Sequence, residues 1–129
     1  MKISTRPTDT KFSIYIRKKH KWTCEFCGRV CRSEDGLTIY YKCEAIHYHS
    51  RRIENTRFNE DNVRCSCFTC HIRLGGATKN ENGEFDLWMK EKLGTKGYAQ
   101  LKLSANTYKK RDDKADLIIL NNLTIIKKK

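Results

Sequence analysis

Two Cys-x-x-Cys pairs constrain this chain more than any other feature of its sequence. Cys24 and Cys27 form the first pair, and Cys67 and Cys70 form the second. Two thiolates at this spacing can face one ion, and two such pairs supply the four ligands of a tetrahedral structural zinc site. Cys65 competes for the second pair, but only Cys67 stands two residues before Cys70. We predict one bound Zn²⁺; the alternative is that one or both pairs are incidental in a cysteine-rich chain.

The size of the chain makes such an ion valuable. Its 129 residues are typical of one domain, and a core this small and polar gains from closing a long segment through a metal. Seven cysteines are an odd number for a secreted disulfide framework, and closely paired cysteines in a reducing compartment are more often metal ligands. Cys31 and Cys43 are predicted to pack as small hydrophobic residues.

The charge of the chain indicates a polyanionic partner. Lys and Arg outnumber Asp and Glu by 27 to 15, which gives a net charge of +12 spread from Lys2 to Lys129. Distributed cations favour phosphate neutralisation with counterion release, although a basic surface without a specific partner is the alternative. The start of the chain lacks the pattern of a secretory signal, and no stretch has the length of a membrane span. We therefore expect a cytoplasmic protein that does not contact membranes.

The apolar pattern predicts short elements joined by polar loops. Residues 1–8 are expected to be loosely attached, and a tight turn is expected at 22–28, with Gly28 in it. A strand pair is predicted at 37–41 and 43–49, followed by a loop over 50–62. The predicted helices run from Asp9 or Thr10 to about 20, from Cys67 or Cys70 to Leu74 with a break at Gly75 and Gly76, over 84–93 up to Gly94, and over 98–103. The segment 112–126 is ambiguous between helix and strand.

Spacing assigns several side chains to a face. A strand has a period of two, so His47 and His49 are predicted to share one face and to address one phosphate. Phe85, Trp88 and Leu93 recur at helical spacing and are predicted to be core residues. His20 is expected to be a solvated residue at a helix end.

The order of the polar residues around the cysteines resembles a known family. His47 comes first, Asn62 stands five residues before the second cysteine pair, and His71 directly follows Cys70. This order resembles the His-Asn-His pattern of HNH endonucleases, whose site is a hairpin followed by a helix. More closely, the chain resembles phage HNH proteins of the NinG recombination type over about 9–94, and more weakly over 98–106. The motifs that carry this resemblance are Asp9–Arg17, Trp22–Gly28, His47–Arg51, Thr56–Asn62 and Cys67–His71.

The resemblance implies an α+β fold. It would be a small, zinc-stapled ββα-metal (HNH) core with flanking N-terminal and C-terminal helices. The implied organisation is a flexible N-terminus over 1–8, a zinc-containing nuclease domain over 9–94, and a C-terminal helical extension with a basic tail over 95–129.

The resemblance also implies a role for each residue of the pattern. His47 would be the general base, since an imidazole with a pKa near 6.5 can accept a proton from water at neutral pH. Asn62 would orient His47, either by fixing its ring or by shaping the loop. His71 would bind a catalytic divalent metal, for which Mg²⁺, Mn²⁺, Ni²⁺ and Zn²⁺ are all candidates.

One position departs from the family pattern. Many HNH sites place Asp or His directly before the base as a second metal ligand, and here that residue is Ile46. We expect His49 to substitute for it. Arg51, Arg52 and Arg57 flank the base and are predicted to bind DNA by clamping phosphate oxygens; the alternative is a solvated basic loop that only attracts DNA.

The sequence therefore predicts a metal-dependent HNH endonuclease that hydrolyses DNA phosphodiester bonds in phage recombination or DNA processing. If it is phage-encoded, it acts in the cytoplasm of the host. The alternative, motivated by Ile46, is a zinc-stabilised DNA-binding module with a degenerate nuclease site. A protein–protein adaptor with a zinc knuckle would leave His47, Asn62 and the charge unexplained.

Overall fold

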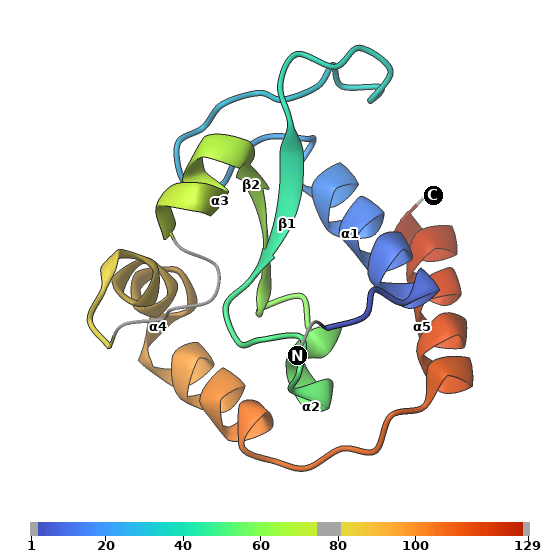
Figure 1. The fold of residues 1–129 in the computed structure, drawn as a ribbon, viewed down its shortest axis with the longest axis vertical. Coiled ribbons are helices and arrows are strands. Elements are labelled where there is room, and N and C mark those ends of the chain that lie inside the picture. The colour runs from blue at the N-terminus through green and yellow to red at the C-terminus, as the bar shows by residue number, and fades with distance from the viewer. Residues whose placement is uncertain (1–2, 75–80, 128–129) are drawn as a thin grey trace.

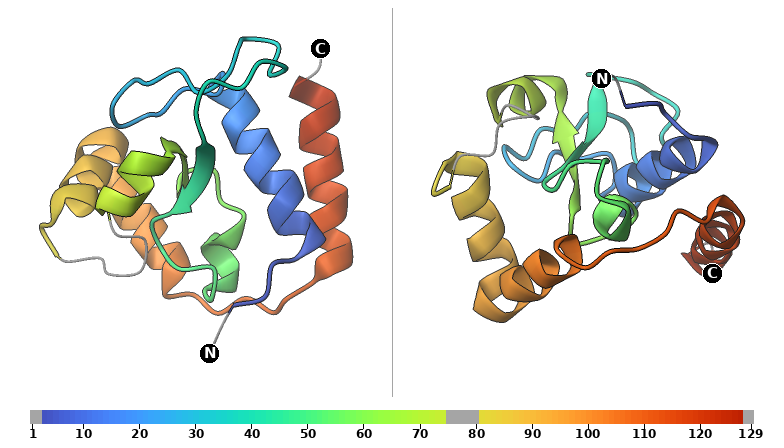
Figure 2. Two further views of the ribbon diagram at one scale, coloured as in Figure 1. Left: turned by 45° about the horizontal axis from the view of Figure 1, so that its top comes forward. Right: turned by 60° about the horizontal axis from the view of Figure 1, so that its bottom comes forward.

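The structure is a computed structural model that describes residues 3–74 and 81–127, the last four of them without their side chains. A small antiparallel sheet lies at the centre, with helices on both sides of it (Figure 1). Helices α1 and α5 cover one side, and α3 and α4 cover the other (Figures 1 and 2). The elements in chain order are α1 (Pro7–Lys19), β1 (Cys43–His47), α2 (Glu54–Arg57), β2 (Val63–Cys67), α3 (Phe68–Leu74), α4 (Glu84–Ala105) and α5 (Asp113–Lys127).

Helix α1 begins two residues before the predicted start. Pro7 stands in its first turn, where the missing N–H costs no hydrogen bond, and the Asp9 carboxylate accepts the Arg6 N–H at 2.7 Å. The helix ends at Lys19, close to the predicted end. Lys21 and Trp22 then adopt φ values of 54° and 55°, which turns the chain into the first cysteine pair.

The sheet pairs β1 with β2, in a register that sets Cys43 opposite Cys67 and His47 opposite Val63. The predicted strand at 37–41 is wrong. That segment makes one isolated bridge, between Arg32 and Ile39, and Leu37 is 82% exposed. Its β-branched and aromatic residues favoured a strand, but Leu37, Ile39 and Tyr40 are exposed, although Tyr41 packs against the core. The true partner of β1 lies farther along the chain.

Strand β2 is buried along its whole length, so its sequence lacks the alternation that marks a half-exposed strand. It continues directly into α3, which begins at Phe68, between the two predicted starts at Cys67 and Cys70, and the Phe68 N–H donates to the Lys42 carbonyl at 2.9 Å. The predicted break at Gly75 and Gly76 lies outside the described residues.

The two C-terminal helices agree with the sequence pattern. Helix α4 is interrupted at Gly94, where φ is 73° and ψ is 172°, so the predicted helix up to Gly94 and the following helix are both present. The segment that was ambiguous between helix and strand is α5. The domain boundary expected at 94 and 95 falls at the α4 kink, and Leu101 beyond it is buried with Ile46.

Two apolar clusters flank the sheet. The first lies toward α1 and contains Phe12, Ile16, Trp22, Val63 and several cysteines. The second lies toward α3 and α4 and contains Ile46, Tyr48, Leu74, Phe85, Met89 and Leu101. Phe85 is buried, and Trp88 and Leu93 pack against the same cluster, which confirms the predicted core face of α4.

The N-terminal segment was expected to be loosely attached, but its described part makes specific contacts. The Arg6 guanidinium binds both carboxylate oxygens of Glu54, at 2.7 and 2.9 Å, and the Ser4 carbonyl accepts a bond from Arg57 at 3.1 Å. Residues 4–6 therefore lie against α2. Over the described part of the chain, no helix combines the length and apolarity needed to cross a membrane.

Candidate functional site

The two cysteine pairs meet as predicted. The Sγ atoms of Cys24, Cys27, Cys67 and Cys70 all lie within 4.8 Å of one another, and those of Cys27 and Cys67 are 3.7 Å apart. Sulfurs that bind one tetrahedral zinc at 2.3 Å lie about 3.8 Å apart, so the cluster fits such an ion. The four cysteines could hold a metal such as zinc.

Local backbone structure aims these thiols. In the first pair, the Gly28 N–H donates to the Cys24 carbonyl at 3.0 Å, and Gly28 takes a φ of 79° to close the turn. In the second pair, the Cys70 N–H donates to the Cys67 Sγ at 3.4 Å as the strand becomes the helix. The tight turn predicted at 22–28 is therefore present.

The other cysteines lie in the first apolar cluster. Cys31, Cys43 and Cys65 are all buried, which confirms the packing role predicted for Cys31 and Cys43. The Cys65 Sγ lies 3.3 Å from the Cys43 Sγ, on the sheet face toward α1. Cys65 is therefore a partner of Cys43 and does not replace Cys67 as a ligand.

A groove of about 780 Å³ runs between α1 and β1 and contains two of the predicted catalytic residues, His47 and His71. Its other polar lining residues come from the N-terminal segment, from α1 and from the loop after β1. They are Thr5, Asp9, Thr10, Ser13, Arg17, Ser50, Arg51 and Arg52.

His47 ends β1, and its ring is held through one nitrogen. Its Nε2 lies 3.1 Å from the carbonyl oxygen of Arg57. A carbonyl only accepts hydrogen bonds, so neutral His47 carries its proton on Nε2 and a lone pair on Nδ1. Burial lowers the pKa of His47 to about 4, against a weaker opposing effect of the Arg57 carbonyl. At neutral pH the residue is an uncharged base in the wall of the groove.

Arg57 does not have the predicted role in binding phosphate. Its side chain is only 3% exposed, and its guanidinium binds the two Asp9 carboxylate oxygens at 2.8 and 2.5 Å. It also donates to the carbonyls of Arg51 and Ser4. Burial raises the pKa of Asp9, but the hydrogen bonds from Arg57 and from the Arg6 amide outweigh it and leave the pKa lowered. Arg57 is thus a structural residue that fixes the carbonyl behind His47.

Asn62 shapes the loop between the strands. It is fully buried; its Oδ1 accepts the His49 N–H at 2.7 Å, and its Nδ2 donates to the carbonyls of His49 and Thr56 at 3.0 Å each. Of the two roles left open by the sequence, these bonds favour loop shaping over direct contact with the His47 ring.

His71 projects from α3 and contacts a residue that sequence reasoning missed. Its Nδ1 lies 3.3 Å from the Glu44 Oε1. Because a carboxylate accepts, this contact assigns the Nδ1 proton and leaves the Nε2 lone pair to bind a metal. The sequence did carry a signal for Glu44. In a strand of period two, Glu44 lies on the same face as Ile46, the position at which many HNH sites supply a metal ligand.

The structure does not bring the expected substitute for Ile46 to the groove. Ile46 is 1% exposed and packs in the second apolar cluster. Strand β1 ends at His47, so the expectation that His47 and His49 share a strand face is wrong. Among the described residues, His49 is not part of the groove lining, and its ring lies against Tyr48 with centroids 4.8 Å apart.

Arg51 and Arg52 both line the groove. The Arg51 Nη1 lies 3.3 Å from the Thr5 Oγ1 and 3.6 Å from the Asp9 Oδ2. Arg17 of α1 is a third arginine of the groove, which sequence reasoning did not single out. It had no distinguishing signal within a run of basic helix residues.

Comparisons with models of known protein families, with curated proteins and with solved structures gave no match.

Proposed function

We propose that this protein is a metal-dependent endonuclease that hydrolyses DNA phosphodiester bonds, with β1, β2 and α3 as an HNH-like ββα core. The observation that carries the proposal is the hydrogen bond between the His47 Nε2 and the Arg57 carbonyl. It leaves the Nδ1 of a neutral imidazole as the basic atom, in a groove that also contains His71 and three arginines. A base next to cations suits attack of water on a phosphodiester.

The residues of the groove divide the chemistry between them. The His47 Nδ1 takes a proton from water as the oxygen attacks phosphorus, while Arg51 and Arg52 bind the non-bridging oxygens. Asn62 and Arg57 hold the loop and the carbonyl that orient the ring. His71 would hold a divalent ion through its Nε2, with its other nitrogen on Glu44. When bound, such an ion supplies charge stabilisation at the phosphate and the leaving oxygen.

DNA as the substrate is supported by the net charge of +12 and by the resemblance of the ordered motifs to NinG-type phage recombination proteins. This resemblance also favours branched or recombining DNA over intact duplex. The four-cysteine cluster would hold structural zinc, since it joins the first turn to the end of β2 and to α3.

One observation favours a second candidate, a zinc-stabilised DNA-binding module without catalysis. Ile46 stands at the position where many HNH sites supply a metal ligand; it lines the groove, but its apolar side chain offers no donor atom. His71 would then hold the ion without a ligand from position 46, and affinity for that ion would be low.

Supercoiled plasmid and a branched DNA junction test the proposal directly. The purified protein, with its zinc content measured, is incubated with each substrate in Mg²⁺, Mn²⁺ or Ni²⁺. We expect cleavage that needs the added metal and falls at least about 100-fold in His47→Ala, as expected for loss of a general base. His20→Ala is the matched control, because His20 lies at the end of α1 and contacts Glu25. Salt-sensitive binding without cleavage in any metal would favour the module.

A further inference from the structure

One cation of the groove has no acidic partner among the described residues. Arg17 donates from Nε to the Ser13 carbonyl at 3.2 Å and from Nη1 to the Cys43 carbonyl at 3.4 Å. Its guanidinium carbon lies 5.3 Å from the centre of the Trp22 ring. All three partners are uncharged, and within the described ranges no carboxylate oxygen lies within 4.0 Å of it.

Three other arginines that are buried in the fold are each paired with a carboxylate. Arg6 lies 2.7 Å from Glu54, Arg57 lies 2.5 Å from Asp9, and Arg64 lies 3.4 Å from Glu25, with all six side chains largely buried. Buried cations are normally paired in this way, because an unpaired charge is costly to remove from water.

Arg17 bears part of that cost. Burial lowers the pKa of Arg17; the nearby Cys43 and Cys65 thiols oppose this shift, and the charge of Arg32 adds to it. Asp9, the one carboxylate among the described lining residues, is already bound by Arg57 and by the Arg6 amide. Glu44 acts on Arg17 only at longer range and contacts His71. An anion from outside the protein would supply the missing counter-charge.

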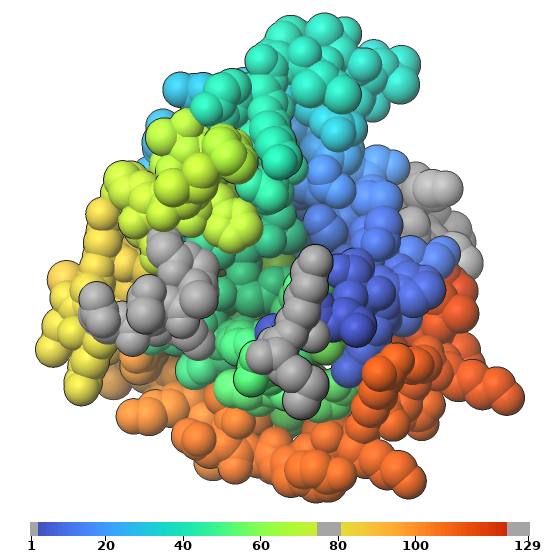
Figure 3. All heavy atoms as spheres, viewed as in Figure 1, coloured from blue at the N-terminus to red at the C-terminus, as the bar shows by residue number. Residues whose placement is uncertain are grey.

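The side chains beside Arg17 suit a phosphate. Thr10, Ser13 and Arg17 recur at intervals of three and four along α1, so they share one face, and all three line the groove. Hydroxyl and guanidinium groups are the common donors to phosphate oxygens in nucleic acids. The surface over β1 lies between α1 and α3 (Figure 3), so the α1 wall faces His71 across the strand that ends in His47.

We propose that the wall formed by Thr10, Ser13 and Arg17 is a binding site for the backbone phosphates of a DNA strand, with Arg17 as its main contact. The inference rests on the proposed function, because it names how the same groove holds its substrate. It places one phosphate on Arg17 and a neighbouring one beside His47, Arg51 and Arg52. The strand lies along α1.

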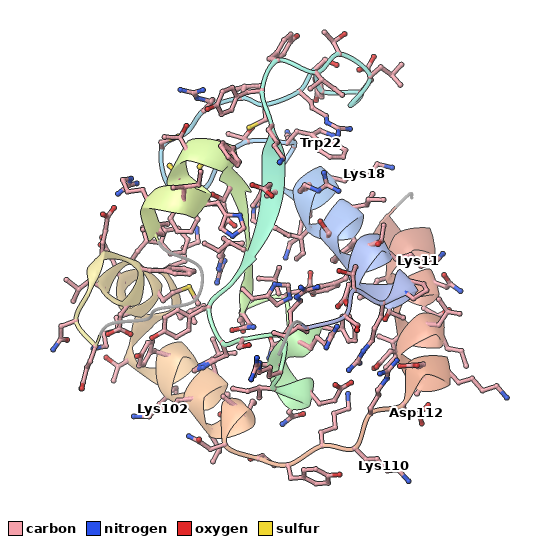
Figure 4. The ribbon with its side chains drawn as sticks, viewed as in Figure 1. Lys11, Lys18, Trp22, Lys102, Lys110 and Asp112 are labelled. Carbon is pink, nitrogen blue, oxygen red and sulfur yellow. The ribbon has the colours of Figure 1, made fainter. Side chains whose placement is uncertain are left out.

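Lys18 provides a matched control. It follows Arg17 on the same helix and carries the same charge, but its side chain is exposed and points outward from the sheet (Figure 4). Removing either charge changes the net charge of +12 equally. A difference between the two variants therefore reports the position of the charge.

The test measures binding of a fluorescein-labelled DNA strand by anisotropy, without catalytic metal and in a His47→Ala background so that no cleavage occurs. We expect Arg17→Gln to weaken binding at least about tenfold and to lower the slope of log K against log salt by about 1. Lys18→Gln should change Kd less than about twofold, since exposed cations act at long range and are screened. The Kd of Arg17→Lys should lie between those of the other two variants, because lysine keeps the charge but lacks the paired N–H donors of the guanidinium group. Equal effects of Arg17→Gln and Lys18→Gln would overturn the inference.

A second measurement covers the case in which Arg17→Gln is misfolded, as judged by zinc content and urea midpoint. The Nε–Hε resonance of Arg17 in the wild-type protein is followed by NMR during titration with the same DNA strand. We expect a saturable shift larger than that of the arginine Nε signals outside the groove; an unmoved signal would overturn the inference.

Arg17-dependent binding in a protein that never cleaves would reject the proposed function and keep this site. If a folded Arg17→Gln variant cleaves DNA and binds it as tightly as the wild type, the Arg17 site would be rejected and the proposed function kept.

Discussion

The ring of His47 is held by the backbone carbonyl of Arg57, 3.1 Å from its Nε2. That carbonyl is positioned in turn by the Arg57 side chain, whose guanidinium is bound to both oxygens of Asp9. A buried ion pair between α1 and α2 therefore sets the orientation of the proposed base. Arginine 57 acts on the site through its main chain, although its charge first indicated a direct contact with DNA.

Removing Asp9 should disturb both stability and the site. Asp9→Ala leaves a buried guanidinium without its partner, a change that costs about 3–5 kcal/mol in other proteins. The double variant Asp9→Ala/Arg57→Met removes both charges and should recover part of the loss. Urea unfolding at neutral pH measures both. Glu84→Ala, which removes the exposed partner of Arg73, is the control and should change the midpoint little. Losses that simply add in the double variant would contradict the pairing.

The activity should stay high well below pH 6.5. Burial lowers the pKa of His47 to about 4, so the neutral base persists as the pH falls and is lost only through that value. Between pH 7.5 and 5.5, kcat/KM should drop less than about twofold, whereas a base with a pKa of 6.5 would lose roughly tenfold. Initial rates in a buffer series at constant ionic strength measure this. An acid limb centred near pH 6.5 would contradict the buried position of the ring.

The same shift acts on folding with a definite sign. The unfolded chain takes up a proton on His47 near pH 6.5, while the folded protein resists it until about 4. The free energy of unfolding therefore decreases as the pH decreases from about 6.5 to 4. His47→Asn should make the free energy of unfolding less dependent on pH in this range.

The sequence predicted the features that depend on residues close together in the chain, but not the contacts between distant residues. The cysteine pairs, α1 and the kink at Gly94 follow from residues close together in the chain, and all are present as expected. The partner of β1 was missed, because β2 is buried on both faces and carries no alternating pattern. Likewise the ion pair that occupies Arg57 joins residues 48 positions apart, and no local pattern reveals such a contact.

The residues of the candidate site were also predicted only in part. His47 and His71 both line the groove, His47 from the end of β1 and His71 from α3, where it directly follows Cys70 of the four-cysteine cluster. His49 was expected to join them on the assumption that the strand continued. The Asn62 side chain instead holds the His49 backbone in the loop.

Removal of one exposed thiol should release the zinc that we propose for the four-cysteine cluster. Cys27 is exposed, so Cys27→Ser removes a ligand with little damage to the core, and we expect bound zinc to fall from about one ion per chain to well below half. The unfolding midpoint should fall with it. Cys31→Ala, at a buried cysteine outside the four-thiol cluster, should keep its zinc. Mass spectrometry of the native protein counts the ions, and equal zinc in both variants would reject the assigned ligands.

A carboxylate at position 46 should destabilise the fold without strengthening metal binding. Ile46 lines the groove but is only 1% exposed, so Ile46→Asp would place a carboxylate largely within the apolar cluster that contains Leu74 and Phe85. We expect a large loss of stability with no gain in metal affinity, whereas Ile46→Val should cost only about 1 kcal/mol. Thermal unfolding and cleavage as a function of Mg²⁺ concentration test this. A folded Ile46→Asp variant that cleaves at lower Mg²⁺ would show that position 46 does face the metal.

The most direct test of the central claim, that His47 is the base, is rescue of His47→Ala by imidazole. Single-turnover cleavage of an end-labelled DNA substrate is measured for the wild type, His47→Ala and His71→Ala, with and without imidazole in the buffer. The account predicts that imidazole restores part of the lost rate in His47→Ala, with a pH dependence set by imidazole itself, and restores none in the wild type. Cleavage by His47→Ala at the wild-type rate without imidazole would contradict it.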